Sequence, residues 1–318
     1  MTDLEQHLLA IIQDAFPLEK HPYQVLADQL GSDEQSVFAA VEGLRKSGII
    51  RRIGGIYDSK ALGFISRLCA GKVPTVVTGA ADDNALEKFA AAVNEIPAIT
   101  HNYVRSHEYN VWFTVIAQSE EEIQKIVDDV CAKTELHDVH VLSATKKYKI
   151  NTVMGGVVRR ALQPCKIPAR ILSDSDRTRI HIACDDIPHS LTPFKDWGVS
   201  CEELREDLAL KRMRRFGAIL RHQEAGFAFN AMVCLAELDK SPNNSAGAIL
   251  AQKPFISHCY DRPAFEGFPY TLYAMMHAQS ADELDRNIKE AAESIGNPDY
   301  VVLHSVRELK KTSYRFFA

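Results

Sequence analysis

The chain has 318 residues, which suits two to four small domains, and its 46% hydrophobic and 25% charged residues are typical of an ordinary globular protein. The formal net charge of -5 argues against a general nucleic-acid binder, because such proteins are usually basic. No apolar run approaches the roughly 20 residues of a membrane span, and the acidic N-terminus lacks the basic start of a signal peptide. We therefore expect a cytoplasmic protein without a membrane partner.

The first 63 residues are predicted to form a winged helix-turn-helix domain. Apolar residues at helical spacing predict three successive helices, and Gly31 and Gly48 stop the second and third. Residues 49–56 then alternate like a strand, a turn follows at 58–60, and a second strand starts near 62. We expect these two strands to pair as a β-hairpin, which would be the wing.

The next segment, residues 64–150, is predicted to form a ferredoxin-like domain. Strands are expected near 64–73, 98–105, 109–117 and 138–147, with helices near 82–94 and 119–132. This βαββαβ order is the ferredoxin-like arrangement. Residues 151–172 contain Gly155, Gly156, Pro164 and Pro168, which indicates a linker.

The second half of the chain repeats the first. RRIGGI at 51–56 returns as RRFGAI at 214–219, ITHNYVR at 99–105 returns as ISHCYDR at 256–262, and AQS at 117–119 returns at 278–280. A second winged helix-turn-helix is therefore expected at 173–227, and a second ferredoxin-like domain at 228–318, with a short insertion around 263–269. The predicted fold class is α+β, a tandem duplication of this two-domain unit.

The cysteines and the two recognition helices exclude some functions. Seven scattered cysteines without a CxxC pair favour buried thiols over a disulfide framework or a zinc site. A recognition helix that reads DNA carries Arg, Lys, Asn or Gln at its N-terminal end. Here the two helices open with Asp33-Glu34 and with Glu202-Glu203, which would repel phosphates. We therefore expect no nucleic-acid partner, although contacts from a dimer keep a transcription regulator open as an alternative.

Several motifs resemble those of a known family. A winged helix followed by βαββαβ is similar to the Lrp/AsnC regulators, and IRRIGG at 50–55, HNYVR at 101–105 and YNVWF at 109–113 look more specifically like the siroheme decarboxylases. RRFGAILRH at 214–222 and PYTLY at 269–273 look like the partner subunit of these enzymes, so the chain resembles both subunits fused.

The resemblance implies an activity. Siroheme decarboxylases remove carbon dioxide from two acetate side chains of siroheme, and didecarboxysiroheme then feeds haem synthesis or the haem of nitrite reductase. It implies a carboxy-lyase that requires no cofactor and has no metal site of its own, since iron enters only with the siroheme substrate. A homodimer through the ferredoxin-like domains is left open, and so is a tetrapyrrole sensor without enzymatic activity.

Arginines and aromatic residues are the predicted substrate-binding groups. Arginine suits the bidentate recognition of carboxylates, and siroheme is a flat polycarboxylate. The alternative is that these arginines are solvated or pair with local acids, and that the aromatic residues are core. The predicted binding residues are Arg51, Arg52, Arg105, Arg214, Arg215, Arg221, Arg262, Tyr57 and Trp112.

Histidines are the predicted proton donors, because loss of carbon dioxide from an acetate on a pyrrole needs protonation of the ring carbon beside it. His101 and His258 occupy equivalent positions in the two halves, and His222 stands on the second wing where the first has Ser59. This mismatch predicts that the second half carries the chemistry. An ordinary strand or turn histidine, or an axial ligand to the siroheme iron, is the alternative for each.

Overall fold

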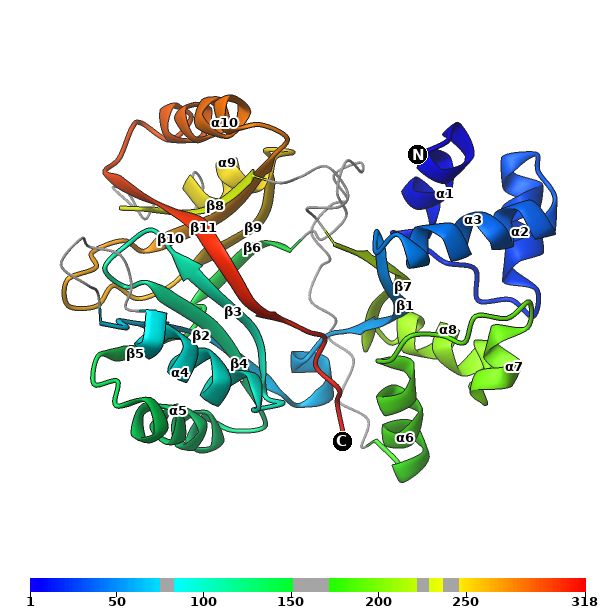
Figure 1. Cartoon of the computed structure of the whole chain (residues 1–318), viewed down its shortest axis with the longest axis horizontal. Coiled ribbons are helices and arrows are strands. Elements are labelled where there is room, and N and C mark those ends of the chain that lie inside the picture. The colour runs from blue at the N-terminus through cyan, green and yellow to red at the C-terminus, as the bar shows by residue number, and fades with distance from the viewer. Residues whose placement is uncertain (75–82, 151–171, 222–228, 237–245) are drawn as a thin grey trace.

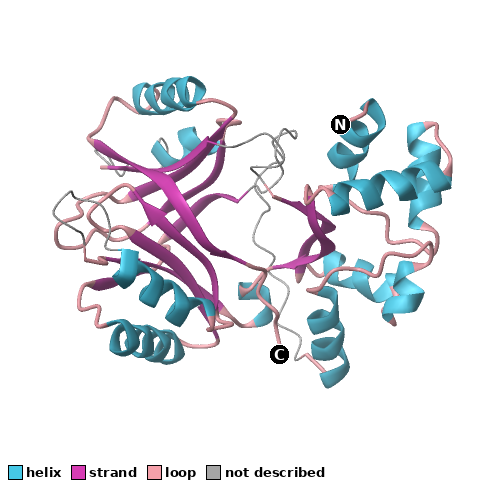
Figure 2. Cartoon of the chain, in the orientation of Figure 1, coloured by secondary structure: helices cyan, strands magenta, loops and turns pink. Residues whose placement is uncertain are grey.

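The computed structural model describes residues 1–74, 83–150, 172–221, 229–236 and 246–318. They form two bodies, a helical one and a sheet one, and each half of the chain contributes to both (Figures 1 and 2). The last residues of the chain run back between the two bodies, where Phe316 is buried in the core of the helical body. Among the described residues, no helix is long and apolar enough to cross a membrane.

The helical body combines the two helix-turn-helix units around one hydrophobic core. Thr2 and Ser173 begin the first helix of each unit with a capping box, which satisfies backbone N–H groups that a helix start leaves free. The elements are α1 (Asp3–Ile12), α2 (Pro22–Leu30), α3 (Glu34–Lys46) and β1 (Ile50–Tyr57) from the first half, and α6 (Asp174–Ala183), α7 (Pro193–Trp197), α8 (Cys201–Ala209) and β7 (Met213–Leu220) from the second.

The wings differ from the prediction. Strand β1 pairs with β7 in an antiparallel ribbon, centred on the pair Gly54 and Gly217, and not with the strand that follows it in sequence. That strand, β2 (Ile65–Gly71), joins the sheet body after the short helix η1 (Lys60–Leu62). The expected hairpin at 49–62 is therefore wrong: each half supplies one strand of a shared ribbon.

The two ribbon glycines explain part of the repeated motif. A Cβ at Gly54 would lie 2.2 Å from the carbonyl oxygen of Asp185 just beyond α6, and one at Gly217 would lie 2.5 Å from the carbonyl oxygen of Ile12 at the end of α1. Each ribbon strand therefore packs against the end of the other half's first helix, where only glycine fits.

The sheet body is one curled sheet of nine strands, in the order β5-β2-β4-β3-β11-β8-β10-β9-β6. Its remaining elements are α4 (Asp83–Asn94), β3 (Ile99–Arg105), β4 (Val111–Ala117), α5 (Glu120–Thr134), β5 (Val139–Leu142), β6 (Lys146–Ile150), β8 (Phe229–Leu235), α9 (Ala246–Ala251), β9 (Ile256–Asp261), β10 (Leu272–Ala278), α10 (Ala281–Glu293) and β11 (Tyr300–Lys311). Helices α4 and α5 cover the first half's outer face, and α9 and α10 cover the second's. The inner faces of the two halves meet in a core around Trp112, Phe268 and Tyr273.

The last strand of each half crosses to the other half. Strand β6 pairs with β9 of the second half, and residues 305–311 of β11 pair with β3 of the first. We call these two segments the exchanged strands. They match position by position, because Lys147 and Glu308 lie opposite the equivalent Tyr260 and Tyr103, and Ile150 and Lys311 lie opposite the equivalent His258 and His101.

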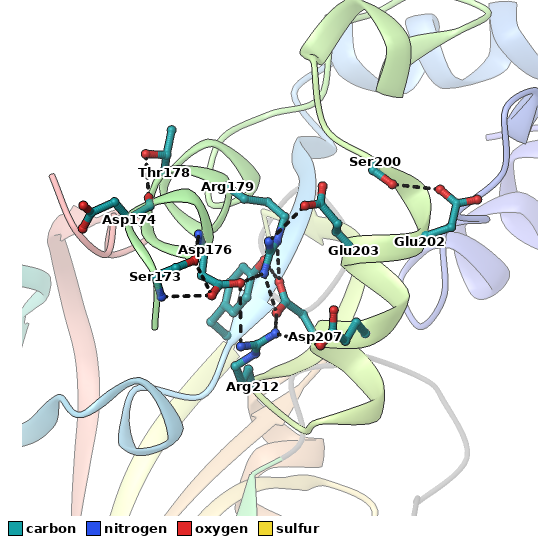
Figure 3. A network of polar contacts seen from close by, with 12 residues as sticks. Ser173, Asp174, Asp176, Thr178, Arg179, Ser200, Glu202, Glu203, Asp207 and Arg212 are labelled. Carbon is teal, nitrogen blue, oxygen red and sulfur yellow. Dashed lines mark hydrogen bonds and ion pairs between the residues drawn. The ribbon is translucent and has the colours of Figure 1, made fainter. Parts of the chain in front are cut away.

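A buried ion network holds the second helix-turn-helix unit together (Figure 3). Arg179 of α6 donates to Asp176 at 2.8 Å and to Asp207 of α8 at 3.2 Å. Arg212 lies 2.7 Å from the same Asp207 carboxylate, which also accepts a hydrogen bond from the Tyr57 hydroxyl. Burial alone raises the pKa of Asp176, but hydrogen bonds from Ser173 and Arg179 hold it well below its usual range. The network is charge-balanced by its own residues.

Six cysteines lie in the described residues, and all six are free thiols. Cys69, Cys184, Cys234 and Cys259 are buried. Burial raises the pKa of Cys234 and Cys69, so these thiols stay protonated at neutral pH. Cys165 lies outside the described residues.

Candidate active site

Two equivalent strands place a His-x-Tyr-x-Arg run on the inner face of the curled sheet. In β3, Val104 packs in the outer core beneath the helices, so the alternation of a strand points His101, Tyr103 and Arg105 inward. In β9, Cys259 packs in the other outer core, so His258, Tyr260 and Arg262 also point inward. The period of two that separates these residues is therefore what brings them to one surface.

Within each run the side chains stack on one another. The rings of His101 and Tyr103 lie 6.5 Å apart, and the Arg105 guanidinium carbon lies 5.3 Å from the Tyr103 ring centroid. The second run has almost the same geometry, with 6.2 Å between the His258 and Tyr260 rings and 5.2 Å from Arg262 to Tyr260. Each tyrosine thus fixes the histidine and the arginine beside it.

The arginines of these two runs, one buried and one half-buried, have no carboxylate partner among the described residues. Arg105 is only 6% exposed, and its guanidinium contacts the Leu303 carbonyl, the Ser305 hydroxyl and the Met275 sulfur. Arg262 donates to the Leu142 carbonyl. Within the described part of the chain neither forms an ion pair, and the Nε atoms of both lack a hydrogen-bond partner. Burial lowers the pKa of Arg105 to about 10, which still leaves it charged at neutral pH. Such charges favour an anionic ligand.

Each ribbon strand carries two consecutive arginines, Arg51-Arg52 in β1 and Arg214-Arg215 in β7. The first arginine of each pair faces the sheet. Arg51 donates to the Lys311 carbonyl at 3.2 Å and to the Ser313 hydroxyl at 3.0 Å. Burial raises the pKa of Tyr103, and the nearby charge of Arg51 opposes this rise. Arg214 is exposed and lies close enough to His258 and Tyr260 for its charge to act on both: burial lowers the pKa of His258 and Arg214 adds to this, whereas burial raises the pKa of Tyr260 to about 12 and Arg214 opposes it. The ribbon therefore adds one arginine above each run.

The second arginine of each ribbon pair turns to the helical body. Arg52 donates to the Ser313 hydroxyl at 2.9 Å and to the Asp185 carbonyl beyond α6 at 3.3 Å. Arg215 donates to the Ala218 carbonyl and lies near Asp14, just after α1. These contacts place both guanidinium groups at helix ends, where a cation is favourable, and away from the two runs.

The exchanged strands and the ribbon ends complete two clusters. Arg221 follows β7, and its amide donates to the Ile49 carbonyl at the start of β1, so this second-half residue lies beside Arg51. Asp58, after β1, takes the equivalent place beside Arg214. We define the first cluster as Arg51, His101, Tyr103, Arg105, Arg221, Glu308 and Lys311, and the second cluster as Asp58, Lys147, Arg214, His258, Tyr260 and Arg262.

The electrostatics around His258 decide its charge. Burial lowers the pKa of this imidazole to about 4, and the positive charges of Arg214, Lys149, Lys147 and Lys311 act in the same direction. His258 is therefore neutral at neutral pH in the free protein. A carboxylate bound beside it would raise its pKa again.

Two further predicted site residues, Tyr57 and Trp112, join neither cluster, as is the case for Arg52 and Arg215. Tyr57 is 4% exposed in the core of the helical body, and its hydroxyl donates to Asp207. Trp112 is buried in the inner core of the sheet, where its Nε1 donates to the Tyr109 carbonyl. His222 lies outside the described residues. Its neighbour Arg221 belongs to the first cluster, because the antiparallel ribbon carries the end of β7 to the first half.

Sequence reasoning did not name Tyr103 and Tyr260, which lie within the repeated strand motif, or Asp58 at the ribbon end, as site residues. It also missed Lys147, Glu308 and Lys311 of the exchanged strands. None lies in a repeated motif, and only strand exchange brings them to the opposite half. The available signal was the match between 146–150 and 307–311, but it becomes visible only through the pairing register. Among the described residues, no group of three or more His, Cys, Asp or Glu side chains is placed to hold a metal ion.

Comparison with known proteins first defines the class. The model of the AsnC-like ligand binding domain matches residues 61–149 and 224–310, and the model of the siroheme decarboxylase NirDL-like HTH domain matches residues 5–51. The chain is thus a duplicated protein of helix-turn-helix units and AsnC-like ligand-binding domains.

Individual relatives then give the family. A siroheme decarboxylase of Hydrogenobacter thermophilus is 33% identical over 98% of this chain and 94% of its own. The siroheme decarboxylase alpha subunit of Desulfovibrio desulfuricans is 45% identical over 47% of this chain and 82% of its own length. A crystal structure of the siroheme decarboxylase NirDL in complex with an iron-uroporphyrin III analogue is 28% identical, with a TM-score of 0.70 over 99% of this chain and 95% of that one. The chain belongs to the siroheme decarboxylase family.

Proposed function

We propose that this protein is a siroheme decarboxylase, which removes the carboxylates of two acetate side chains and gives didecarboxysiroheme for haem or nitrite-reductase haem biosynthesis. The observation that carries the proposal is the pair Arg105, which is buried, and Arg262, which is half-buried; they have no carboxylate partner in the described structure and face the inner side of the sheet. A polycarboxylate would supply the negatively charged partners that these arginines lack. Whole-length similarity to siroheme decarboxylases supports the same substrate.

In this proposal, the substrate binds where the ribbon faces the sheet. Arg51 and Arg214 from the ribbon, and Arg105 and Arg262 from the sheet, are the candidate contacts for its carboxylates. Arg221 joins them beside Arg51. The stacked tyrosines hold the sheet arginines in place before the substrate arrives, so that less side-chain entropy is lost on binding.

The proposed reaction is acid catalysis that needs no cofactor. A histidine, His101 or His258, donates a proton to the ring carbon next to the one that bears the acetate, which leaves the pyrrole positively charged. The bond to the carboxylate then breaks, carbon dioxide leaves, and the electron pair of that bond neutralises the pyrrole by forming a double bond between the ring and the exocyclic carbon. The exocyclic carbon then takes up a proton and becomes a methyl group, and the protonated ring carbon loses the proton that it gained in the first step. Each acetate thus consumes one proton overall, and the iron remains part of the substrate.

Anaerobic incubation of the purified chain with siroheme, followed by mass spectrometry, tests the function. We expect loss of two carbon dioxide units without any added cofactor. Unchanged siroheme would contradict the enzyme and leave a tetrapyrrole sensor, because a sensor would share the binding site. A requirement for an added metal or organic cofactor would contradict only the cofactor-free mechanism.

The alternative of a DNA-binding regulator is disfavoured by the two recognition helices. Helix α3 begins at its capping residue Asp33 and Glu34, and its basic residues Arg45 and Lys46 pair with Asp186 and Glu42. Helix α8 begins with two exposed glutamates in its first turn. We expect no sequence-specific duplex binding, and a salt-sensitive footprint at nanomolar protein would revive the regulator.

The two ferredoxin-like halves already pack on each other within one chain. We propose a cytoplasmic enzyme in which this internal contact replaces the contact between separate subunits. A homodimer would need a different surface. Light scattering of the purified chain measures which state occurs.

A further inference from the structure

The two clusters are built from equivalent positions, but they differ most strongly next to the histidine. In the first cluster, Lys311 of the exchanged strand lies opposite His101, whereas Ile150 occupies the matching place opposite His258. A carboxylate beside His101 would therefore meet a cation. The same group beside His258 would meet an aliphatic side chain at this matched position, although the charges of Lys147 and Lys149 on this strand also act on His258.

The ribbon ends differ in the same direction. Arg221 lies beside Arg51 in the first cluster, and Asp58 lies near Arg214 in the second. The Asp58 carboxylate accepts from the amides of Lys60 and Ala61, so it is held in place. Adjacent arginines favour a carboxylate, while a fixed aspartate near Arg214 opposes one.

One matched position differs in the opposite direction, since Glu308 of the first cluster stands where the second has Lys147. However, Glu308 is already engaged. It shares a hydrogen bond with the Tyr103 hydroxyl, and its Oε2 lies 3.8 Å from the Lys311 Nζ. It therefore engages the tyrosine and the lysine, and its charge also acts on Arg51, while Arg105 and Arg221 are the arginines left to a ligand.

We propose that the reacting acetate is held beside His101 in the first cluster, and that Lys311 is a further substrate-binding residue that orients it. The active centre is then shared between the halves: β3 and β1 come from the first, and Lys311 and Arg221 come from the second. This inference rests on the proposed function. The second cluster contacts other substrate carboxylates at most, so both acetates are processed in turn at one centre.

The test uses matched variants of the full chain. Lys311→Ile copies the second cluster, and Ile150→Lys is its mirror image. Arg307→Ala, an exposed residue of the same strand, is the control for folding, and Lys311→Gln serves if the isoleucine variant is unstable. Siroheme affinity is measured by spectroscopic titration, and turnover by anaerobic mass spectrometry. Lys311→Ile should weaken binding roughly tenfold, as for loss of one charge-assisted hydrogen bond, while Ile150→Lys and Arg307→Ala should change it less than about twofold. Wild-type affinity in both Lys311 variants would overturn the proposal.

The two histidines give the second arm. At saturating siroheme, His101→Ala should slow the loss of the first and of the second carbon dioxide alike, by about a hundredfold or more. His258→Ala should slow both by less than about tenfold. If His101→Ala instead stops at the mono-decarboxylated product, or if His258→Ala is the slower variant, the single centre is wrong. Wild-type protein that leaves siroheme unchanged would refute the proposed function itself, which separates the two failures.

Discussion

Buried arginines occur in both bodies of the molecule, and their partners differ. In the helical body, Arg179 and Arg212 share the carboxylates of Asp176 and Asp207. In the sheet body, Arg105 and Arg262 have carbonyl, hydroxyl and sulfur partners but no described carboxylate. In the first arrangement aspartates neutralise the arginines without a ligand, whereas the second leaves positive charge for one. The comparison teaches that burial of a charge indicates a binding site only where the protein does not neutralise it.

The largest expected effect is on stability, and it comes from a substitution in the ion network of the helical body. Asp207→Ala removes a fully buried carboxylate from between two arginines and the Tyr57 hydroxyl. We expect the free energy of unfolding to fall by about 3–5 kcal/mol, because two buried cations lose their main partner. Urea denaturation measures this loss. Glu203→Ala removes only the exposed member of the network, 3.4 Å from Arg179, and is the matched control, which should cost less than about 1 kcal/mol. Equal losses in the two variants would show that burial does not decide the effect.

The next effect concerns the pH dependence of stability. Burial holds the pKa of His258 at about 4 in the folded chain, against about 6.5 when unfolded. Between these values the unfolded chain binds a proton that the folded one does not, so the stabilisation is present above pH 6.5 and is lost as pH falls towards 4. The loss is at most about 3 kcal/mol. Denaturation of wild type and of His258→Gln at pH 7 and 4.5 should reveal a smaller pH-dependent loss in the variant. The same slope in both would contradict the assignment to His258.

The arginines of the sheet body should respond to substitution in the opposite way to the ion network of the helical body. Arg105→Met keeps much of the buried volume and removes a charge that has no described carboxylate. We expect stability to stay the same or to rise by about 1 kcal/mol, while siroheme affinity falls tenfold or more. Thermal denaturation and spectroscopic titration of one sample measure both. Destabilisation comparable to that of Asp207→Ala would place Arg105 with the structural arginines.

The smallest effect separates the two arginines of the ribbon. Arg52→Ala removes hydrogen bonds to Ser313 and to the Asp185 carbonyl, so it should cost about 1 kcal/mol of stability with little change in siroheme affinity. Arg51→Ala removes hydrogen bonds to the Ser313 hydroxyl and the Lys311 carbonyl, so it should cost a similar amount of stability, but it should also weaken siroheme binding because Arg51 faces the first cluster. Both variants are measured by denaturation and titration. A larger loss of affinity in Arg52→Ala would return Arg52 to the carboxylate contacts.

Much of the fold followed from the sequence. The repeated motifs predicted the duplication, and helical and strand periodicity predicted the helix-turn-helix units and the ferredoxin-like order of elements. The wing hairpin was wrong because the alternation in residues 49–56 predicts a strand without specifying its partner. Any strand edge offers the same N–H and C=O groups, and the packing of the whole helical body selected β7.

The candidate site could be predicted from the sequence only in part. The spacing of two in HNYVR and in HCYDR is local, so it alone placed each histidine, tyrosine and arginine on one face of a strand. The sequence also determined that arginines gather on the repeated ribbon motif. It could not distinguish Arg51 from Arg52, because their difference lies in which body each side chain reaches.

Only the tertiary structure decided how the halves combine. The assignment of His222 to a second-half centre stays a prediction, because this residue lies outside the described structure, but the antiparallel ribbon places its neighbour Arg221 beside Arg51 of the first half. Likewise, strand exchange brings Lys311 to His101 and Ile150 to His258 from the opposite halves. The sequence determined the residue types and their local faces, because those depend on neighbours along the chain. The partners across the interface depend on contacts between residues far apart in the chain, which only the packed structure fixes.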